Sequence, residues 1–195
     1  MACGRGLPDR RIGQLVSAPR HAVLTGAPGA GKTTLLEAAA AAGLPTSPEV
    51  ARELLRQPGG MELRERDPLG FAEAMLDAHL REYERFAEGP FPVLFDRGFP
   101  DVVGFYDLTG RPIPARLDQV CRTLRYHGPI LRAAPWAEIY RQDAQRIQTW
   151  DEAVESDRAI IAAWRRYGYE VIDLPLTEVG ERLDFLTSRL RSHRG

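Results

Sequence analysis

The sequence predicts an α/β fold in which a parallel sheet is covered by helices on both faces. Short apolar segments bounded by turn residues alternate along the chain with longer segments of helix-forming composition. The first apolar segment, residues 21–25, is separated by one glycine-rich turn from a helix-forming run at residues 32–43. Neighbouring parallel strands need a crossover connection, usually a helix, so this alternation favours a parallel sheet.

The predicted strands are short and lie between turn residues. In chain order they are residues 21–25, 44–46, 91–96, 129–133 and 169–174. Residues 20–195 contain no repeat, low-complexity segment or linker, and we expect them to form a single domain. Residues 1–19 mix glycine, proline and arginine with little apolar periodicity, which predicts a flexible N-terminal segment.

The predicted helices are bounded by start and stop residues. In chain order they are residues 32–43, 49–56, 68–86, 100–108, 115–125, 140–147, 151–167 and 177–191. Gly43 closes the first of these helices, and Pro68 opens the long amphipathic third one. Residues 61–67 are charged and weakly patterned, so we expect a mobile segment there.

The composition argues against several classes of protein. Of 195 residues, 44% are hydrophobic and 27% are charged, as in an ordinary globular protein. The net charge is −1, with acids and bases interspersed, so no nucleic-acid or membrane partner is expected. No apolar run reaches spanning length, and the N-terminus lacks the apolar core of a signal peptide. We expect a cytoplasmic monomer or homodimer in which Cys3 and Cys121 are reduced. His79 and His127 are isolated and indicate no metal cluster.

The turn after the first strand matches a phosphate-binding loop. Residues 26–33 fit G-x-x-x-x-G-K-[ST] at every fixed position, and a strand precedes them and a helix follows, as the motif requires. Glycines let backbone amides face phosphate oxygens, and the helix directs its positive end at the anion. Lys32 would carry charge to the outer phosphates, and the Thr33 hydroxyl would bind Mg²⁺. A chance glycine turn would need neither neighbour, so we expect a nucleoside triphosphate with Mg²⁺. The expected nucleotide-binding residues are Gly26, Ala27, Pro28, Gly29, Ala30, Gly31, Lys32, Thr33 and Thr34.

An acid and a base follow the strand at residues 91–96. Asp96 lies at its carboxyl end, where the sites of α/β sheets form, and is a candidate Mg²⁺ ligand. Asp96 and Arg97 together resemble the Asp-Arg motif of nucleoside and nucleotide kinases, in which the arginine contacts the acceptor side of the site. The alternative is a turn-capping aspartate beside a surface arginine. The position at a strand end favours the functional interpretation.

The helix predicted at residues 140–147 is a candidate lid. Arg141 and Arg146 could neutralise charge on a transferred phosphoryl group when such a lid closes. Their five-residue spacing separates them around a regular helix, which would suit contacts to a triphosphate from two sides. The alternative is a solvated helix in which Asp143 pairs with Arg146.

Glu49 and Arg52 follow the short extended segment and share one helical face at i, i+3 spacing. Glu49 is a candidate general base toward an acceptor hydroxyl, or an acceptor-binding group together with Arg52. Alternatively, Glu49 is simply favoured by the helix dipole and paired with Arg52. The sequence supports both interpretations equally.

An ordered set of motifs resembles one known family. The set comprises residues 26–34, 49–52, 95–98 with Pro100 and Asp101, 139–146 and 168–171. It resembles small bacterial AAA-type P-loop proteins, a group similar to the ribosylnicotinamide kinase domain of the bacterial NAD regulator and, more distantly, to thymidylate kinases. The resemblance implies a P-loop NTPase fold, a three-layer αβα sandwich with a five-stranded parallel sheet of order 2-3-1-4-5, and a mobile helical lid.

Together these features predict a small-molecule kinase that uses ATP and Mg²⁺. The chain lacks an Asn-Lys-x-Asp guanine-reading motif, so ATP is the expected donor and GTP is the alternative. The alternative function is a regulatory or nucleotide-sensing NTPase without a phosphorylated product, and the nearly neutral charge disfavours nucleic-acid handling. The acceptor is not identified by the sequence. The expected catalytic residues are Lys32, Glu49, Asp96, Arg141 and Arg146, the acceptor-binding residues Arg52 and Arg97, and the metal ligands Thr33 and Asp96.

Overall fold

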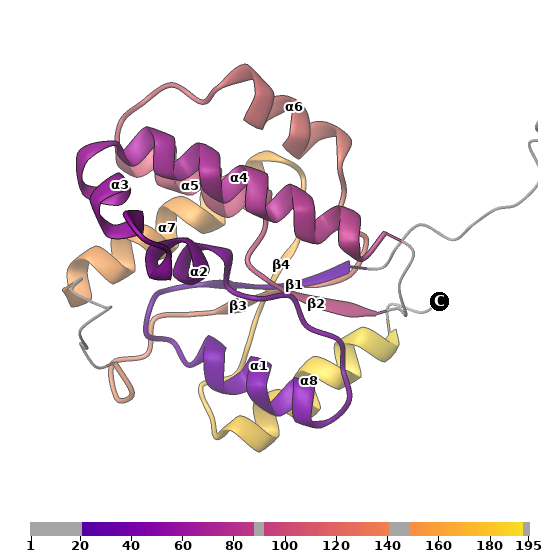
Figure 1. The fold of residues 1–195 in the computed structure, drawn as a ribbon. Coiled ribbons are helices and arrows are strands. Elements are labelled where there is room, and N and C mark those ends of the chain that lie inside the picture. Colours follow the sequence, from indigo (N-terminus) through magenta and orange to yellow (C-terminus); the bar gives the residue numbers. More distant parts are fainter. Residues whose placement is uncertain (1–20, 88–91, 141–148, 193–195) are drawn as a thin grey trace, which may run out of the picture.

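The described part of the chain contains four strands, separated from one another by one or more of eight helices (Figure 1). The computed structural model describes residues 21–87, 92–140 and 149–192. The elements are β1 (His21–Gly26), α1 (Lys32–Ala41), α2 (Val50–Arg56), α3 (Gly60–Arg66), α4 (Pro68–Arg85), β2 (Val93–Asp96), α5 (Phe99–Leu108), α6 (Ala115–Thr123), β3 (Ile130–Ala133), α7 (Trp150–Arg166), β4 (Val171–Asp173) and α8 (Val179–Ser192). The predicted α/β class is confirmed.

The sheet is parallel throughout, with strand order β2-β1-β3-β4. This is the expected 2-3-1-4-5 order, except that the strand predicted at residues 44–46 is reduced to one bridge between Thr46 and Leu94. Two backbone hydrogen bonds hold this edge segment, from the Leu94 amide to the Pro45 carbonyl at 2.9 Å and from the Ser47 amide to the Leu94 carbonyl at 3.0 Å. Pro45 has no amide hydrogen to extend the ladder toward the N-terminus, and on the other side the Asp96 amide donates to the Ser47 hydroxyl rather than to a backbone carbonyl.

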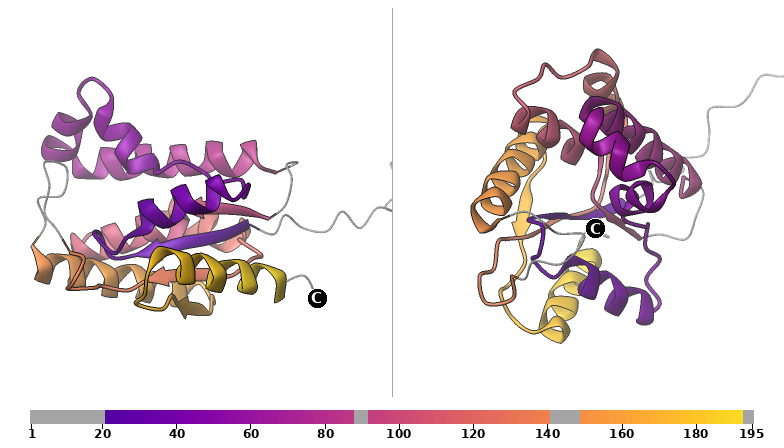
Figure 2. Two further views of the ribbon diagram at one scale, coloured as in Figure 1. Left: turned by 90° about the horizontal axis from the view of Figure 1, so that it is seen from below. Right: turned by 60° about the vertical axis from the view of Figure 1, so that its left-hand side comes forward.

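The two faces of the sheet are covered by different helices (Figure 1, Figure 2). Successive residues of β1 point to opposite faces. Leu24 packs with Leu35 of α1 and Leu186 of α8 on one face, whereas Val23 joins Trp164 of α7 and residues of α4, α5 and α6 on the other. These side chains are fully buried, which fixes the register of the central strand and the three-layer arrangement.

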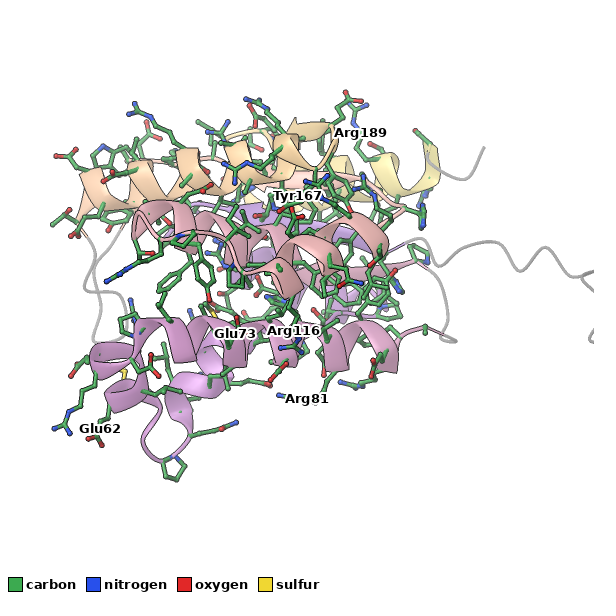
Figure 3. The ribbon with its side chains drawn as sticks, turned by 90° about the horizontal axis from the view of Figure 1, so that it is seen from above. Glu62, Glu73, Arg81, Arg116, Tyr167 and Arg189 are labelled. Atoms are coloured by element: carbon green, nitrogen blue, oxygen red, sulfur yellow. The ribbon has the colours of Figure 1, made fainter. Side chains whose placement is uncertain are left out.

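Side-chain ion pairs connect helices α4 and α6, which both pack on the face of the sheet that carries Val23. Arg116 of α6 points toward α4 in Figure 3 and pairs there with Glu73 at 3.3 Å and Asp77 at 2.5 Å. The Tyr106 hydroxyl of α5 also donates to Glu73, at 3.3 Å. Glu73 therefore links three helices that stand on the same face of the sheet.

Residues 61–67 differ from the prediction, because most of them form helix α3. Its exposed face carries an ion pair between Glu62 and Arg66 at 2.6 Å, and Leu63 packs against the core. The single apolar contact is too sparse to give a periodic pattern in the sequence, so tertiary packing rather than propensity explains this short helix.

Two predictions lie outside the described residues: the flexible segment at residues 1–19 and the helix at residues 140–147, with Arg141, Asp143 and Arg146. Within the described ranges, no helix combines the length and the apolar composition needed to cross a bilayer.

Candidate functional site

The phosphate-binding loop lies at the carboxyl edge of the sheet, between β1 and α1. Gly26, Gly29 and Gly31 adopt positive φ angles of 113°, 78° and 77°, a region that glycine enters without steric cost. A Cβ on Gly26 would lie 2.4 Å from the carbonyl oxygen of Ala133 in β3, so a side chain has no room there. The motif glycines are thus required by the path of the backbone.

Helix α1 begins directly after the loop with its positive end uncompensated. Its N-cap, Gly31, has no side chain to bond the first amides, and its first turn carries no acidic residue. The unpaired amides and the helix dipole make this position suited to an anion. Thr33 and Thr34 are exposed on this first turn and line the adjoining cavity.

Lys32 lies over the loop and is only 7% exposed. Its Nζ donates to the carbonyl oxygens of Ala27 at 2.6 Å and Gly26 at 3.2 Å. Burial lowers the pKa of Lys32 to about 7; the charge of Arg97 also lowers it, and Asp96 acts in the opposite direction. Bound phosphates would supply the negative charge that this ammonium group lacks.

Asp96 ends β2 and is 3% exposed. Its Oδ1 has no hydrogen-bond partner in the described structure, and its amide donates to the Ser47 hydroxyl at 3.0 Å. Burial raises the pKa of the carboxyl group to about 6; Glu49 also raises it, and Lys32 lowers it. A buried carboxylate oxygen without a donor is suited to a cation, so the role of Asp96 as a Mg²⁺ ligand stays a prediction that the geometry fits.

The remaining metal ligands would come from Thr33 and the nucleotide itself. The described residues contain no group of three or more His, Cys, Asp or Glu side chains that could hold a metal. Mg²⁺ in nucleotide sites is commonly bound by one or two protein groups together with phosphates and waters. A single carboxylate, Asp96, beside the phosphate-binding loop agrees with that pattern.

Arg97 is held in place by Asp101. Its backbone is in the left-handed region, at φ 66°, and its amide donates to the Leu24 carbonyl at 3.0 Å. The guanidinium donates to Asp101 Oδ1 at 2.9 Å. Asp101 also accepts from the Thr25 hydroxyl at 2.6 Å, the Gly98 amide at 3.1 Å and the Trp164 indole at 3.0 Å. The capping role that was the alternative for Asp96 is thus filled by Asp101, which bonds the N-cap amide of α5.

Glu49 and Arg52 form the i, i+3 ion pair that the sequence allows, with Nε and Oε2 3.1 Å apart. Glu49 is the N-cap residue of α2, and both side chains are partly exposed and line the cavity. The pairing agrees with the structural interpretation, and the position beside Lys32 and Arg97 agrees with the functional one. The catalytic role of Glu49 therefore stays a prediction.

One cavity of about 830 Å³ joins these groups. The phosphate-binding loop, Glu49, Arg52 and Arg97 line one part of it, and apolar side chains of α2, α4, α5 and α7 line another. Asp101 also lines this cavity. The volume is within the usual range of small-molecule sites, about 300–1,000 Å³.

Arg182, in the first turn of α8, also lines this cavity and was not predicted. It is 3% exposed, its Nη1 donates to the Ala30 carbonyl at 3.0 Å, and it lies over the Trp136 ring at 5.9 Å. Its Nε is unpaired and no carboxylate pairs with it, as far as the described chain extends. Burial lowers the pKa of this guanidinium. A buried cation against the loop and without a counterion indicates an anionic ligand.

Comparison of the sequence with protein-family models gives a match to an AAA-domain family over residues 21–182. The chain belongs to this AAA-domain family. Sequence comparison with curated proteins gives no match.

Solved structures of nucleoside kinases share the fold of this AAA-family chain. Deoxyadenosine kinase from M. mycoides with the products dCMP and a flexible dCDP superposes with a TM-score of 0.64, at 15% identity, over 88% of this chain and 99% of that one. The same enzyme with bound dATP gives a TM-score of 0.63 at 12% identity, over 88% and 99% of the two chains. The NadR protein in complex with NR gives 0.63 at 19% identity, over 89% of this chain but only 52% of that one. These similarities establish a P-loop, nucleoside-kinase-like fold.

The sequence contains one weak indication that Arg182 has a functional role. A cation in the first turn of a helix opposes the helix dipole, and such a placement needs another reason. The lid residues Arg141 and Arg146 lie outside the described residues, so their contribution to the cavity stays a prediction.

We expect Arg182→Met to weaken ATP binding about tenfold or more without lowering the melting temperature of the free protein. Methionine keeps most of the side-chain volume and removes a buried charge whose desolvation is unfavourable, while the nucleotide loses one cationic contact. Isothermal calorimetry and thermal melts measure the two effects. Arg189→Met, on the exposed side of the same helix (labelled in Figure 3), is the matched control. Unchanged ATP affinity in Arg182→Met would remove this residue from the site.

Proposed function

We propose that this AAA-family protein is a kinase that transfers the γ-phosphoryl group of ATP to a small nucleoside-like acceptor. The observation that carries the proposal is a cavity that is lined both by the phosphate-binding loop and by apolar side chains of four helices, which we call the apolar compartment. A protein that only hydrolyses or senses a nucleotide needs no second compartment next to the γ-phosphate. The fold shared with deoxyadenosine kinase supports the same conclusion by analogy.

In this proposal the loop amides, the N-terminus of α1 and Lys32 bind the triphosphate. Arg182 adds a charge at Ala30, on the outer side of the loop. Thr33 and Asp96 would hold Mg²⁺, which would neutralise charge on the phosphoryl oxygens when bound. Bound phosphate would add negative charge next to Lys32 and raise its pKa, so the ammonium form is favoured in the complex.

The acceptor would enter from the apolar compartment and meet Arg97 and Glu49 near the loop. Asp101 fixes the Arg97 guanidinium, so this cation would be positioned before the acceptor binds. Glu49 would accept the proton of an acceptor hydroxyl or, with Arg52, hold the acceptor in place. Arg141 and Arg146 would stabilise the phosphoryl group in transfer and help exclude water, which prevents wasteful hydrolysis.

The test begins with an acceptor screen. Nucleosides, nucleotides and related metabolites are tested for ATP consumption above the background without acceptor. With the best acceptor, Arg141→Ala and Arg146→Ala should each lower kcat by about a hundredfold, because a preorganised charge donor acts mainly in the transition state. ATP affinity should fall much less. The exposed Arg81, on the outer part of α4 (labelled in Figure 3), provides the control variant Arg81→Ala.

The competing function is a regulatory NTPase. It would be supported if no acceptor stimulated turnover and both arginine variants left slow basal hydrolysis unchanged. In that case the proposal of a kinase would lose its mechanistic basis, while nucleotide binding at the loop would stand.

A further inference from the structure

The apolar compartment is lined by side chains from four helices. They are Leu55 of α2, Phe71 and Met75 of α4, Val102 and Phe105 of α5, and Ile160 of α7. Two of the six are phenylalanines, from α4 and α5, and neither they nor the others bring a charge into the compartment. Aromatic side chains prefer to stack on or meet the edge of a planar ring, so this surface is suited to a flat and uncharged group.

His79 is the polar exception in the wall that α4 contributes. It follows Phe71 and Met75 at four-residue spacings, so the three side chains lie along one face of the helix. All three line the cavity, and His79 is 3% exposed. Its ring meets the edge of Phe99, with centroids 6.4 Å apart.

Among the described residues, His79 makes a ring contact with Phe99 but no hydrogen bond through its imidazole. Buried polar groups are hydrogen-bonded in the large majority of cases, so an unpaired imidazole on a cavity wall calls for a partner that enters the cavity. The nearby carboxylate of Asp101 already accepts four hydrogen bonds, from Thr25, Arg97, Gly98 and Trp164. A ligand that enters the cavity can supply such a partner.

The imidazole is uncharged at neutral pH. Burial lowers the pKa of His79 to about 4; Asp101 raises it and Arg97 lowers it. A neutral imidazole offers one N–H donor and one nitrogen acceptor. Its partner therefore need not be an anion, and a phosphate group would be better matched by Arg52, Arg97 and Arg182, which also line the cavity.

We propose that His79 determines acceptor specificity by a hydrogen bond to an uncharged heteroaromatic ring that is bound among the apolar side chains. This inference rests on the proposed kinase function, since it assigns the apolar compartment to the acceptor. An uncharged nucleobase satisfies the requirement, with its ribose directed toward Arg97 and Glu49. The positively charged pyridinium of ribosylnicotinamide does not satisfy it, because none of the six apolar side chains carries a charge that could pair with it.

Binding and turnover are measured for adenosine, deoxyadenosine, cytidine, uridine and ribosylnicotinamide with wild-type protein, His79→Phe and His79→Gln. Phenylalanine fills the space and removes the hydrogen bond, whereas glutamine restores a donor and an acceptor. We expect at least one uncharged nucleoside to bind the wild type more tightly than ribosylnicotinamide. For that nucleoside, His79→Phe should raise KM about 10- to 100-fold with kcat changed less than threefold, and His79→Gln should recover part of the loss. ATP affinity should be unchanged, and the exposed His127→Phe is the matched control.

Nucleoside analogues that lack one ring nitrogen make the assignment specific. If adenosine binds, it is compared with 1-deaza-, 3-deaza- and 7-deazaadenosine. One of these analogues should bind the wild type about tenfold more weakly than adenosine does. The same analogue and adenosine should bind His79→Phe equally, because the loss of the ring nitrogen and the loss of the imidazole remove the same hydrogen bond. Calorimetric binding without phosphorylation would contradict the proposed function and leave the role of His79 intact. Phosphorylation of a nucleoside with equal KM in His79→Phe and wild type would overturn the role of His79 and leave the kinase intact. Failure of every uncharged nucleoside to bind the wild type would also overturn it.

Discussion

Lys32→Ala is expected to lower ATP·Mg²⁺ affinity by about a hundredfold, roughly 3 kcal/mol, because hydrogen bonds to charged groups contribute about 1.5–3 kcal/mol each. The free variant should stay folded, since the buried ammonium group has a lowered pKa and its charge does not stabilise the free protein. Thermal melts with and without ATP·Mg²⁺ measure both effects, because bound nucleotide raises the melting temperature by mass action. An equal nucleotide-induced shift in the variant and the wild type would contradict a role of the loop.

The sequence permits an independent chemical test of Lys32, because it is the only lysine in the chain. Apart from the N-terminus, an amine-acylating reagent can modify only this side chain. Its pKa of about 7 means that labelling should increase with pH through neutrality rather than near pH 10.5. ATP·Mg²⁺ should protect the amine, and peptide mass spectrometry should show the loss of label. Labelling that is unaffected by saturating ATP would show that the nucleotide binds elsewhere.

Asp101→Ala is expected to destabilise the fold by about 3–5 kcal/mol, which lowers the melting temperature by roughly 10 °C. Asp101 is 7% exposed and accepts hydrogen bonds from Thr25, Arg97, Gly98 and Trp164. Alanine leaves these four donors unpaired in or near the core, one of them charged. The variant should also raise KM for the acceptor, because Arg97 loses the group that positions it.

The matched control for Asp101→Ala is Asp107→Ala, two turns along the same helix. Asp107 pairs with Arg166 at 3.0 Å, but both side chains reach solvent, so its loss should cost less than about 1 kcal/mol. Calorimetric or circular dichroism melts compare the two variants. Similar melting temperatures for Asp101→Ala and Asp107→Ala would contradict the central position of Asp101 in the hydrogen-bond network.

The parts of the site that are local in sequence were predictable. The loop at residues 26–33 joins consecutive elements, and its glycines at positive φ are required by the path of the backbone. The position of Asp96 follows from the end of an apolar strand. In both cases the side chain and the element that positions it are neighbours in the chain, so a pattern of a few residues was sufficient.

The parts that depend on tertiary contacts were not predictable. Arg182 reaches the loop because α8 packs on α1, 152 residues away from Ala30 in the chain. His79 has the spacing of a core residue on α4, and only the cavity and its missing partner distinguish it from one. Asp101 belongs to a recognised motif, but its four bonding partners come from three separate segments. None of these relations leaves a periodic pattern.

The short edge strand shows how turn chemistry modifies an otherwise correct prediction. Residues 44–46 form the expected edge segment, but the missing amide hydrogen of Pro45 and the side-chain bond of Ser47 limit the segment to one bridge with β2. The segment still places Ser47 where its hydroxyl accepts the amide of Asp96. It therefore supports the candidate metal ligand even though it is not a full strand.

Product analysis tests the central proposal most directly. Wild-type protein is incubated with Mg²⁺, γ-labelled ATP and the best acceptor from the screen, and ADP, inorganic phosphate and phosphorylated acceptor are quantified by mass spectrometry. The kinase proposal predicts ADP and phosphorylated acceptor in equal amounts, with the label on the acceptor. Neither product should form above background with Lys32→Ala or without Mg²⁺. Release of the label as inorganic phosphate, in an amount equal to ADP and independent of the acceptor, would contradict it.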